Sequence, residues 1–411
     1  MTEKFFAAAN SSEGFVCWFD EIFSPETLDR CFIIKGGSGT GKSTFMKRVA
    51  AEAEKKGWRA EYFFCSSDPS SLDGVILHGG DGDLRRAALL DGTAPHSHDP
   101  KLPGAVEEIV NLGECWDTVP LAERRAEIAA LTAEKSKRFS ESYEYLWAAG
   151  EISKLLRSEA AGLLLADKMR TAVDRLLTRL ANEARHREND RVGSEAKSKP
   201  SLRGKLSDTT HDSNGNEKPL REKRSTRAKG KVSTRPVSAI STLGEVSFDT
   251  YLSLGERLFI AFDSLGTLSF LFDELIKRAS EMGFDVVRAP SPLLPDESEA
   301  IFIPALGVSF VSEELIDRAD GNGFAKQLYY SDPAARMLNM TRFIDADAVS
   351  RDDRRRRRTL SKCVRELRDG ALARLGEVRR LHAGVESIYI SAMDFGKVDR
   401  LREKVEKKLF G

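Results

Sequence analysis

The stretch from Gly36 to Thr44 has the residue types and the spacing of a loop that holds phosphate groups. Its sequence, GGSGTGKST, fits the pattern G-x-x-x-x-G-K-S. Glycines permit positive φ angles, with which successive backbone N–H groups can surround a phosphate. Lys42 would bring a positive charge to the β- and γ-phosphates, and the Ser43 hydroxyl would reach Mg²⁺. The predicted nucleotide-binding residues are Gly36, Gly37, Ser38, Gly39, Thr40, Gly41, Lys42, Ser43 and Thr44, with Lys42 also the predicted catalytic cation.

The residues on either side of this loop predict the elements that position it. Cys31–Ile34 is a short apolar run, typical of a buried strand in a parallel sheet. A helix is expected from Lys42 to about Lys56, and Gly57 is the residue type that commonly follows a helix. The N-terminus of that helix would direct its positive dipole at the phosphates. Strand, loop and helix together are the context that the motif requires.

Asp91 is the predicted acidic partner of the metal ion. It ends the apolar run Ala87–Leu90, which predicts a strand next to the strand before the loop. A carboxylate in that place holds the Mg²⁺ ion, here through water. The alternative is an ordinary strand that ends in an Asp-Gly turn.

Asp68 is the candidate catalytic base. It follows the predicted strand Arg59–Phe64 and would lie at the carboxyl edge of the sheet, where ligands bind in open α/β sheets. Asp-Pro-Ser is equally typical of a turn. Both interpretations stay open.

Two further pairs of ionisable residues follow Asp91. Glu107 and Glu108 are expected in the acidic first turn of a helix. His96 and His98 could bind a metal ion or the γ-phosphate, but two histidines without a third well-spaced ligand favour a polar loop.

The chain has 411 residues and a formal net charge of zero, with 64 basic and 64 acidic side chains. Residues 191–235 carry 13 Lys or Arg and five Asp or Glu, a net charge of +8, and few large apolar residues. Such a segment cannot bury enough surface to fold, so residues 183–236 are predicted to be a disordered basic linker. The rest of the chain then carries about −8. A basic linker allows contact with nucleic acid, but it has no aromatic residues for base stacking, so this partner is not favoured.

Five cysteines lie far apart and form no C-x-x-C pair, which predicts reduced thiols and a cytoplasmic protein. The longest apolar stretch in the helical region, residues 160–166, is far shorter than the roughly 20 residues that span a bilayer. No membrane partner is expected.

The two halves of the chain share landmarks in the same order, which predicts an internal duplication. Residues 14–20 parallel 244–249, and residues 30–34 parallel 257–261. Gly39-Thr40 is matched by Gly266-Thr267. The predicted fold class is α/β, a P-loop NTPase fold with a parallel sheet, duplicated, with a long helical segment after each copy. The predicted parts are a P-loop NTPase domain (1–119), a helical segment (120–182), the linker (183–236), a degenerate P-loop-like α/β domain (237–345) and a C-terminal helical segment (346–411).

Each helical segment is long enough for a pair of antiparallel helices. The arginine run 354–358 is expected on a solvated helix face or turn, with phosphate contact the less favoured alternative.

The second copy departs from the first where the chemistry would occur. Lys42 is matched by Ser269 and Gly41 by Leu268, and Asp263 is added to the loop. Without the lysine and most of the glycines, this loop is not expected to hold a triphosphate. The sequence therefore predicts one competent nucleotide site.

At these residues the chain resembles a family of bacterial proteins built from two tandem P-loop ATPase-like halves. The resemblance is carried by residues 35–44, 65–75, 90–96 and 99–113. It covers most of the first half closely and the second half loosely. It implies an ATPase-like fold and ATP binding. In that family both halves typically look competent for nucleotide, so the altered second loop and the basic linker are departures.

The sequence thus favours a Mg·ATP-binding ATPase that transfers a phosphoryl group to water. ATP is preferred over GTP because no Asn/Thr-Lys-x-Asp element for guanine is present. The alternatives are a small-molecule kinase with Asp68 as its base and a nucleotide-binding regulatory module with little turnover. Packing of the two copies against each other is also expected.

Overall fold

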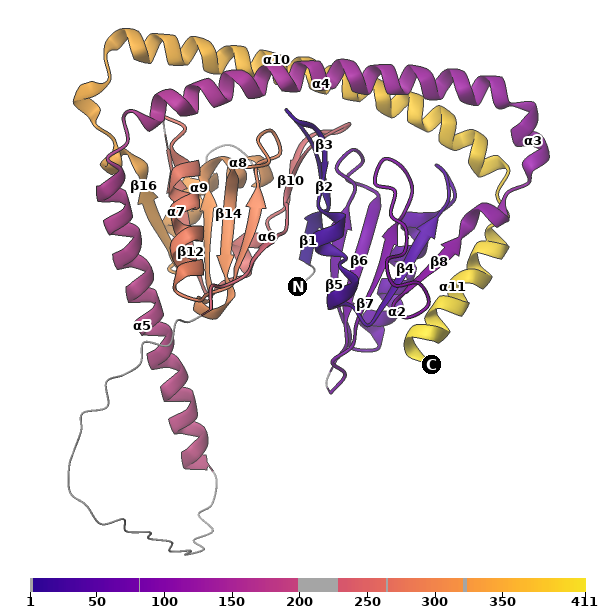
Figure 1. Ribbon diagram of the computed structural model, residues 1–411, viewed down its shortest axis with the longest axis horizontal. Helices are drawn as coiled ribbons and strands as arrows, with labels where there is room; N and C mark the ends of the chain where they lie inside the picture. Colours follow the sequence, from indigo (N-terminus) through magenta and orange to yellow (C-terminus); the bar gives the residue numbers. More distant parts are fainter. Residues whose placement is uncertain (1–2, 81, 199–227, 264, 321–323) are drawn as a thin grey trace, which may run out of the picture.

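The structure is a computed structural model that describes residues 3–80, 82–198, 228–263, 265–320 and 324–411. Two α/β units lie side by side beneath two long helices (Figure 1). We call residues 3–117 the N-terminal unit and residues 228–349 the C-terminal unit. Among the described residues, no helix is long and apolar enough to cross a membrane.

The N-terminal unit contains a six-stranded mixed sheet with the order β1-β5-β6-β7-β4-β8. The strands are β1 (Glu3–Phe6), β4 (Arg30–Lys35), β5 (Arg59–Phe64), β6 (Leu72–His78), β7 (Arg86–Asp91) and β8 (Glu107–Asn111). Strand β4 is parallel to both β7 and β8, and β6 is antiparallel to both of its neighbours. The prediction of an α/β fold is confirmed. The sheet is not wholly parallel, because the short connections before and after β6 return the chain in the opposite direction.

The C-terminal unit contains a sheet with the corresponding order, β9-β13-β14-β15-β12-β16. The strands are β9 (Val232–Thr234), β12 (Arg257–Phe262), β13 (Val286–Pro290), β14 (Ser298–Ile303), β15 (Val308–Ser312) and β16 (Ala335–Asn339). Each neighbouring pair has the same relative direction as its counterpart in the first sheet. Positions in the two sheets can therefore be matched through the strand register.

The smaller elements also occur in matching order. Two hairpins, one in each unit, are β2 (Ala8–Ser11) with β3 (Gly14–Cys17) and β10 (Ser238–Ser241) with β11 (Gly244–Ser247). The helices that lie within the units are α1 (Phe19–Ile22), α2 (Lys42–Lys55), α6 (Thr250–Ser253), α7 (Leu268–Glu281), α8 (Glu313–Asp320) and α9 (Phe324–Ser331). Helix α2 follows β4 and α7 follows β12, and both helices have 14 residues.

The helical segments are exchanged between the two units. After α3 (Thr118–Glu123), the long helix α4 (Arg125–Ala161) crosses to the C-terminal unit, where α5 (Ala166–Ser198) packs. Helix α10 (Arg351–Ser391) runs back along α4, and α11 (Phe395–Phe410) packs on the N-terminal unit (Figure 1). The prediction of long helices is confirmed. The pairing is different from the expected one, because α4 pairs with α10 of the other segment.

Apolar side chains explain this exchange. In α11, Val398, Val405 and Leu409 are buried with Phe45 and Val49 of α2. The corresponding face of α7 is covered instead by α5, whose buried apolar residues are Met169, Val173, Leu177, Leu180 and Ala181. Each unit therefore completes its core with a helix from the segment that follows the other unit.

The two units also share one hydrophobic core. Phe63 and Ile76 of the first sheet belong to the same buried cluster as Leu258 and Val311 of the second. Buried polar contacts join the units as well, including an ion pair between Glu61 and Arg235. The expectation that the two copies pack against each other agrees with these contacts.

The boundaries of the predicted linker are wrong at both ends. Helix α5 continues to Ser198, and β9 begins at Val232 and pairs with β13. Short apolar and β-branched residues within a charged stretch were enough for an edge strand here. The remaining part of the predicted disorder, residues 199–227, lies outside the described residues.

Candidate functional site

The glycine-rich loop, residues 36–44, joins the C-terminal end of β4 to α2. Strand β4 is buried because Phe32, Ile33 and Ile34 are fully covered by neighbouring elements. Gly39 and Gly41 have φ angles of 71° and 83°, a region that side chains other than glycine rarely adopt. Gly41 is the N-cap of α2. No described side chain accepts a hydrogen bond from the first amide groups of the helix, so these groups are open to an anion. Strand, loop and helix are placed as the sequence predicts.

Lys42 lies across this loop. Its Nζ donates hydrogen bonds of 2.8 Å to the carbonyl oxygens of Gly36 and Gly37, and it lies 3.5 Å from Asp91 Oδ2. The hydroxyl of Thr93 also donates to the Gly36 carbonyl, at 2.8 Å. The ammonium group is thus held at the edge of the loop that an anion would approach.

Asp91 ends β7, the strand beside β4, as predicted. Its Oδ1 accepts a hydrogen bond from the backbone N–H of Thr93, so the Asp-Gly turn is also present. Ser43 is the second residue of α2, and its hydroxyl accepts a hydrogen bond of 2.9 Å from the N–H of Leu72, the first residue of β6. Ser43 and Asp91 therefore lie at the same edge of the sheet, where both could contribute to a metal site.

Asp68 lies in the loop between β5 and β6, at the carboxyl edge of β5. Its Oδ1 accepts hydrogen bonds from the backbone N–H and the hydroxyl of Ser70, at 3.1 and 2.7 Å. These bonds form the turn that was the alternative to a base, and they favour it.

Asp73 is a site residue that the sequence did not single out. It is the second residue of β6 and is directly beside Asp91 in the strand register, since Gly74 pairs with Leu90. Asp73 is buried, and its Oδ2 has no hydrogen-bond partner. Burial, together with the neighbouring Asp91 carboxylate, raises the pKa of Asp73. Only strand pairing brings the two aspartates together, so no local pattern in the sequence could have identified the pair.

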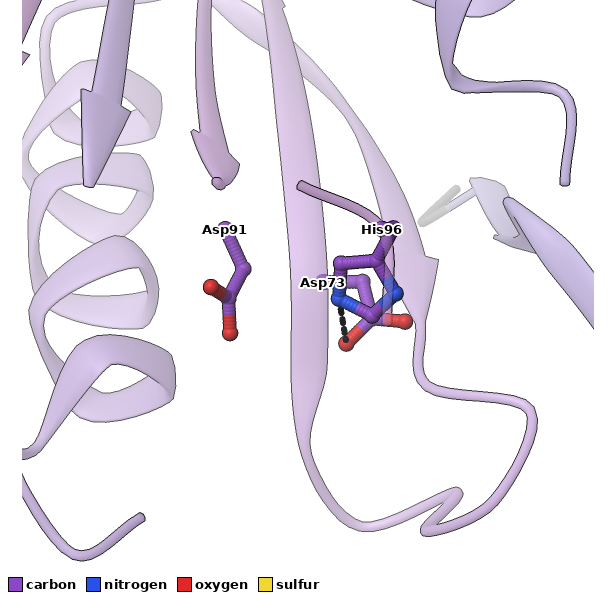
Figure 2. Close-up of side chains that lie close together, drawn as sticks. All are labelled: Asp73, Asp91 and His96. Carbon is purple, nitrogen blue, oxygen red and sulfur yellow. Dashed lines mark ion pairs between the residues drawn. The ribbon is translucent and has the colours of Figure 1, made fainter. Parts of the chain in front are cut away.

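His96 completes a cluster with these two carboxylates (Figure 2). Its Nε2 lies 3.7 Å from Asp73 Oδ1, and one face of its ring stacks on Phe19 with the ring centres 4.6 Å apart. Its Nδ1 is buried without a partner, and burial lowers its pKa, which favours the neutral imidazole. One donor atom from each of Asp73, Asp91 and His96 lies within 4.8 Å of the other two. His96 lies in a loop, as expected, but its ring is buried and stacks on Phe19.

His98 and Glu107 have a different role from His96. The prediction that Glu107 and Glu108 begin a helix is wrong, because Glu107–Asn111 is strand β8. The buried Glu107 carboxylate accepts hydrogen bonds from the N–H groups of Lys101 and Leu102 and contacts His98 Nε2 at 3.2 Å. The pairing of β8 with β4 and these bonds fix the loop that carries both histidines.

The end of α10 covers the glycine-rich loop. An added Cβ at Gly39 would come within 2.8 Å of the Glu386 carbonyl oxygen and 3.0 Å of Ile390 Cγ1. At Gly41 the nearest atom would belong to Phe395, the first residue of α11. The loop therefore needs glycine both for its φ angles and for this close packing.

The corresponding loop of the C-terminal unit contains its own anion. The carboxylate of Asp263 accepts hydrogen bonds from the backbone N–H groups of Leu265, Thr267 and Leu268 and from the Thr267 hydroxyl. Gly266 has a φ angle of 73°, close to that of Gly39, and α7 follows as α2 follows in the first unit. A carboxylate thus fills the ring of amide groups at the start of α7.

The counterpart of Asp73 is also paired internally. Register matching places Glu299 at the position of Asp73 and Ser312 at the position of Asp91. Glu299 is buried and forms an ion pair with Arg318 of α8. Burial raises the pKa of Glu299 and the Arg318 guanidinium opposes that rise.

The arginine run 354–358 forms part of the first turns of α10. Arg357 is buried and donates to the carbonyl oxygens of Leu156 and Leu265, whereas the other four side chains are exposed, as expected. Arg354 and Arg358 line a cleft of about 1410 Å³ between the C-terminal unit and helices α4 and α10, together with Asp263. The five cysteines are free thiols, as predicted.

Comparisons with protein-family models, with curated proteins and with solved structures find no match.

Proposed function

We propose that the chain is a duplicated P-loop protein whose N-terminal unit binds Mg·ATP at the glycine-rich loop and hydrolyses it. The observation that carries the proposal is the carboxylate of Asp263 in the corresponding loop. A backbone of this shape surrounds an oxyanion there with three N–H groups. The position of Asp263 is occupied by Gly36 in the first loop, which leaves the amide groups available to a phosphate.

The surrounding residues have the charges that a nucleoside triphosphate requires. Lys42 Nζ lies at the mouth of the loop and could exchange its two carbonyl acceptors for phosphate oxygens. Ser43 and Asp91 would share the metal ion, with Asp91 acting through water. A bound Mg²⁺ ion would neutralise charge on the phosphates. The amide groups and Lys42 would stabilise the charge that develops as the terminal phosphoryl group is transferred.

The other candidate functions have less support. The kinase alternative requires Asp68 to accept a proton, and its two hydrogen bonds to Ser70 favour the turn instead. A regulatory module that binds nucleotide with little turnover uses the same residues and differs only in rate. ATP is the proposed nucleotide because the sequence has no guanine-recognition element.

Thermal unfolding with ATP or GTP in the presence of Mg²⁺, together with phosphate release, tests the proposal. At about 100 times the dissociation constant, ATP should stabilise the wild type by about 2.7 kcal/mol. Lys42→Ala should lose this stabilisation and the release of phosphate. Failure of both nucleotides to shift the transition would contradict the proposal, and binding without phosphate release would favour the regulatory module.

A further inference from the structure

We propose that Asp73, Asp91 and His96 together hold a divalent transition-metal ion such as Mn²⁺, and that they do so before nucleotide binds. The inference deepens the proposed function and rests on it in one respect, since Asp91 belongs to both. It assigns two additional ligands, Asp73 and His96, and it changes the expected metal from Mg²⁺.

Within the described part of the chain, Asp73 has no cation of its own in this cluster. Asp73 and Asp91 are neighbours across the strand register, and both are buried. Lys42 lies 3.5 Å from Asp91, but among the described residues no lysine or arginine forms an ion pair with Asp73. Asp73 Oδ2 and His96 Nδ1 are both buried without a hydrogen-bond partner. Buried polar atoms are normally satisfied, so the open Asp73 Oδ2, beside the Asp91 carboxylate and His96 Nε2, indicates a site for a ligand.

The size and shape of the cluster also suit a metal ion. Ligand atoms that bind an ion from opposite sides, at about 2.0–2.2 Å, lie roughly 4 Å apart. The donor atoms of Asp73, Asp91 and His96 already lie within 4.8 Å of one another, so small side-chain rotations would close the site. The three residues come from β6, β7 and the loop after β7, and Figure 2 shows the His96 ring beside the Asp73 carboxylate, with Asp91 next to them. Phe19 supports the His96 ring from one side.

The C-terminal unit satisfies the counterpart of Asp73 with a cation from the chain itself. Glu299, which corresponds to Asp73, is neutralised by Arg318 from the helix that follows β15. In the first unit, the segment between β7 and β8 contains no arginine that could neutralise Asp73 in this way. It places His96 beside Asp73 instead. The buried acid is therefore satisfied by a guanidinium in one unit, and it would be satisfied by a metal ion in the other.

The ligand types select the metal. Mg²⁺ prefers oxygen ligands and retains several waters, whereas an imidazole nitrogen suits first-row transition metals. Two carboxylates and one imidazole therefore favour Mn²⁺ or Zn²⁺ over Mg²⁺ or Ca²⁺.

The test is a titration of the metal-free full-length chain with MnCl₂ in the absence of nucleotide, with free Mn²⁺ measured by electron paramagnetic resonance. Wild type should bind about one Mn²⁺ per chain. His96→Gln and Asp73→Asn should each weaken binding about tenfold or more. His98→Gln is the matched control, because His98 lies on the same loop but contacts Glu107. Its binding should equal that of the wild type. Zn²⁺ should displace the bound Mn²⁺ at concentrations where Mg²⁺ does not.

A second measurement needs no variant. Pulsed electron paramagnetic resonance of the wild-type Mn²⁺ complex should detect a coordinated ¹⁴N nucleus, from His96. No bound Mn²⁺, bound Mn²⁺ without nitrogen coupling, or equal losses in the His96 and His98 variants would overturn the inference. ATP binding that depends on Lys42, combined with any of these results, would leave the proposed function standing and reject only the metal site. Mn²⁺ binding without ATP binding would support the site and contradict the proposed function.

Discussion

The two units place loops of similar path at corresponding strand ends, but they satisfy the polar groups of those loops in opposite ways. In the C-terminal unit, Asp263 fills the ring of amide groups and Arg318 neutralises the buried acid Glu299. In the N-terminal unit, Gly36 stands at the position of Asp263 and Asp73 at that of Glu299, and no lysine or arginine among the described residues forms an ion pair with Asp73. Corresponding polar groups are therefore satisfied within the chain in the C-terminal unit and left open in the N-terminal unit.

The same comparison extends to the other site residues. Ser312 stands where the first unit has Asp91, and Ser269 stands where it has Lys42. At these two positions the second unit therefore has neither the lysine nor the aspartate of the first. Its Asp263 and Glu299 carboxylates are paired within the chain, whereas Asp73 Oδ2 and His96 Nδ1 of the first unit have no hydrogen-bond partner among the described residues.

Replacing Arg318 should give the largest effect, because it leaves a buried acid without its cation. We expect Arg318→Met to lower the free energy of unfolding by about 3–5 kcal/mol in urea denaturation. The control is Arg170→Met, which removes an exposed ion pair with Asp167 and should cost at most about 1 kcal/mol. Equal losses in the two variants would show that Arg318 does not have this internal role.

The comparison of the two loops predicts that only one lysine position matters for nucleotide. Lys42→Ala should weaken ATP binding about 100-fold, since truncating a charged contact typically costs 2–5 kcal/mol. Ser269→Ala, the matched change in the second loop, should leave ATP affinity unchanged. Fluorescence titration with a labelled ATP analogue measures both. A large loss in the Ser269 variant would place nucleotide in the second unit.

Glu61, which pairs with His78 of its own unit and with Arg235 of the other, has a pH-dependent contribution to stability. Burial raises the pKa of Glu61, but the hydrogen bond from His78 and the charge of Arg235 outweigh it and lower that pKa to about 2. Since the pKa is depressed on folding, this stabilisation is present above about pH 4.3 and is lost as the pH falls toward 2. Glu61→Gln should remove a contribution on the order of 2 kcal/mol at neutral pH and flatten the acid side of the stability profile.

Urea denaturation between pH 2.5 and 7 measures the profile. Glu52→Gln is the control, because the Glu52 carboxylate pairs with the exposed Lys55. Because that pair is exposed to solvent, this variant should change the acid dependence much less than Glu61→Gln does. A Glu61 variant with an unchanged profile would contradict the assignment of this acid sensitivity to Glu61.

Removing the internal anion should give the smallest effect. Asp263→Asn keeps an oxygen acceptor but loses the charge, so we expect a loss of about 1 kcal/mol in the free energy of unfolding. Asp345→Asn is the control, since its carboxylate accepts one exposed hydrogen bond, from the N–H of Asp347. An Asp263 variant as stable as wild type would show that the carboxylate contributes nothing to the loop.

The parts of the site that could be predicted from the sequence depend on local pattern. The apolar run of β4, the glycines and Lys42 follow one another in the chain, so their arrangement as strand, loop and helix was predictable. Asp91 was predictable for the same reason, from an apolar run that ends in an acid. Asp73 and His96 meet Asp91 only through strand pairing and loop packing. Residue types and their spacing along the chain do not predict these contacts.

The packing partners of the long helices could not be predicted from the sequence either. Periodicity predicts that α4, α5, α10 and α11 are helices, but it does not state which apolar face meets which partner. Packing of α11 on α2 and of α5 on α7 joins segments about 350 and 100 residues apart. The error at Glu107 has a similar origin, because its burial and its pairing with β4 override the preference of acids for helix starts.

The number of ATP molecules bound per chain is the most direct test of the proposal that only the N-terminal unit binds nucleotide. Isothermal titration calorimetry of the full-length chain with ATP and Mg²⁺ should give one site, absent in Lys42→Ala and retained in Asp263→Asn. Two sites per chain, or one site that survives in Lys42→Ala, would contradict the account.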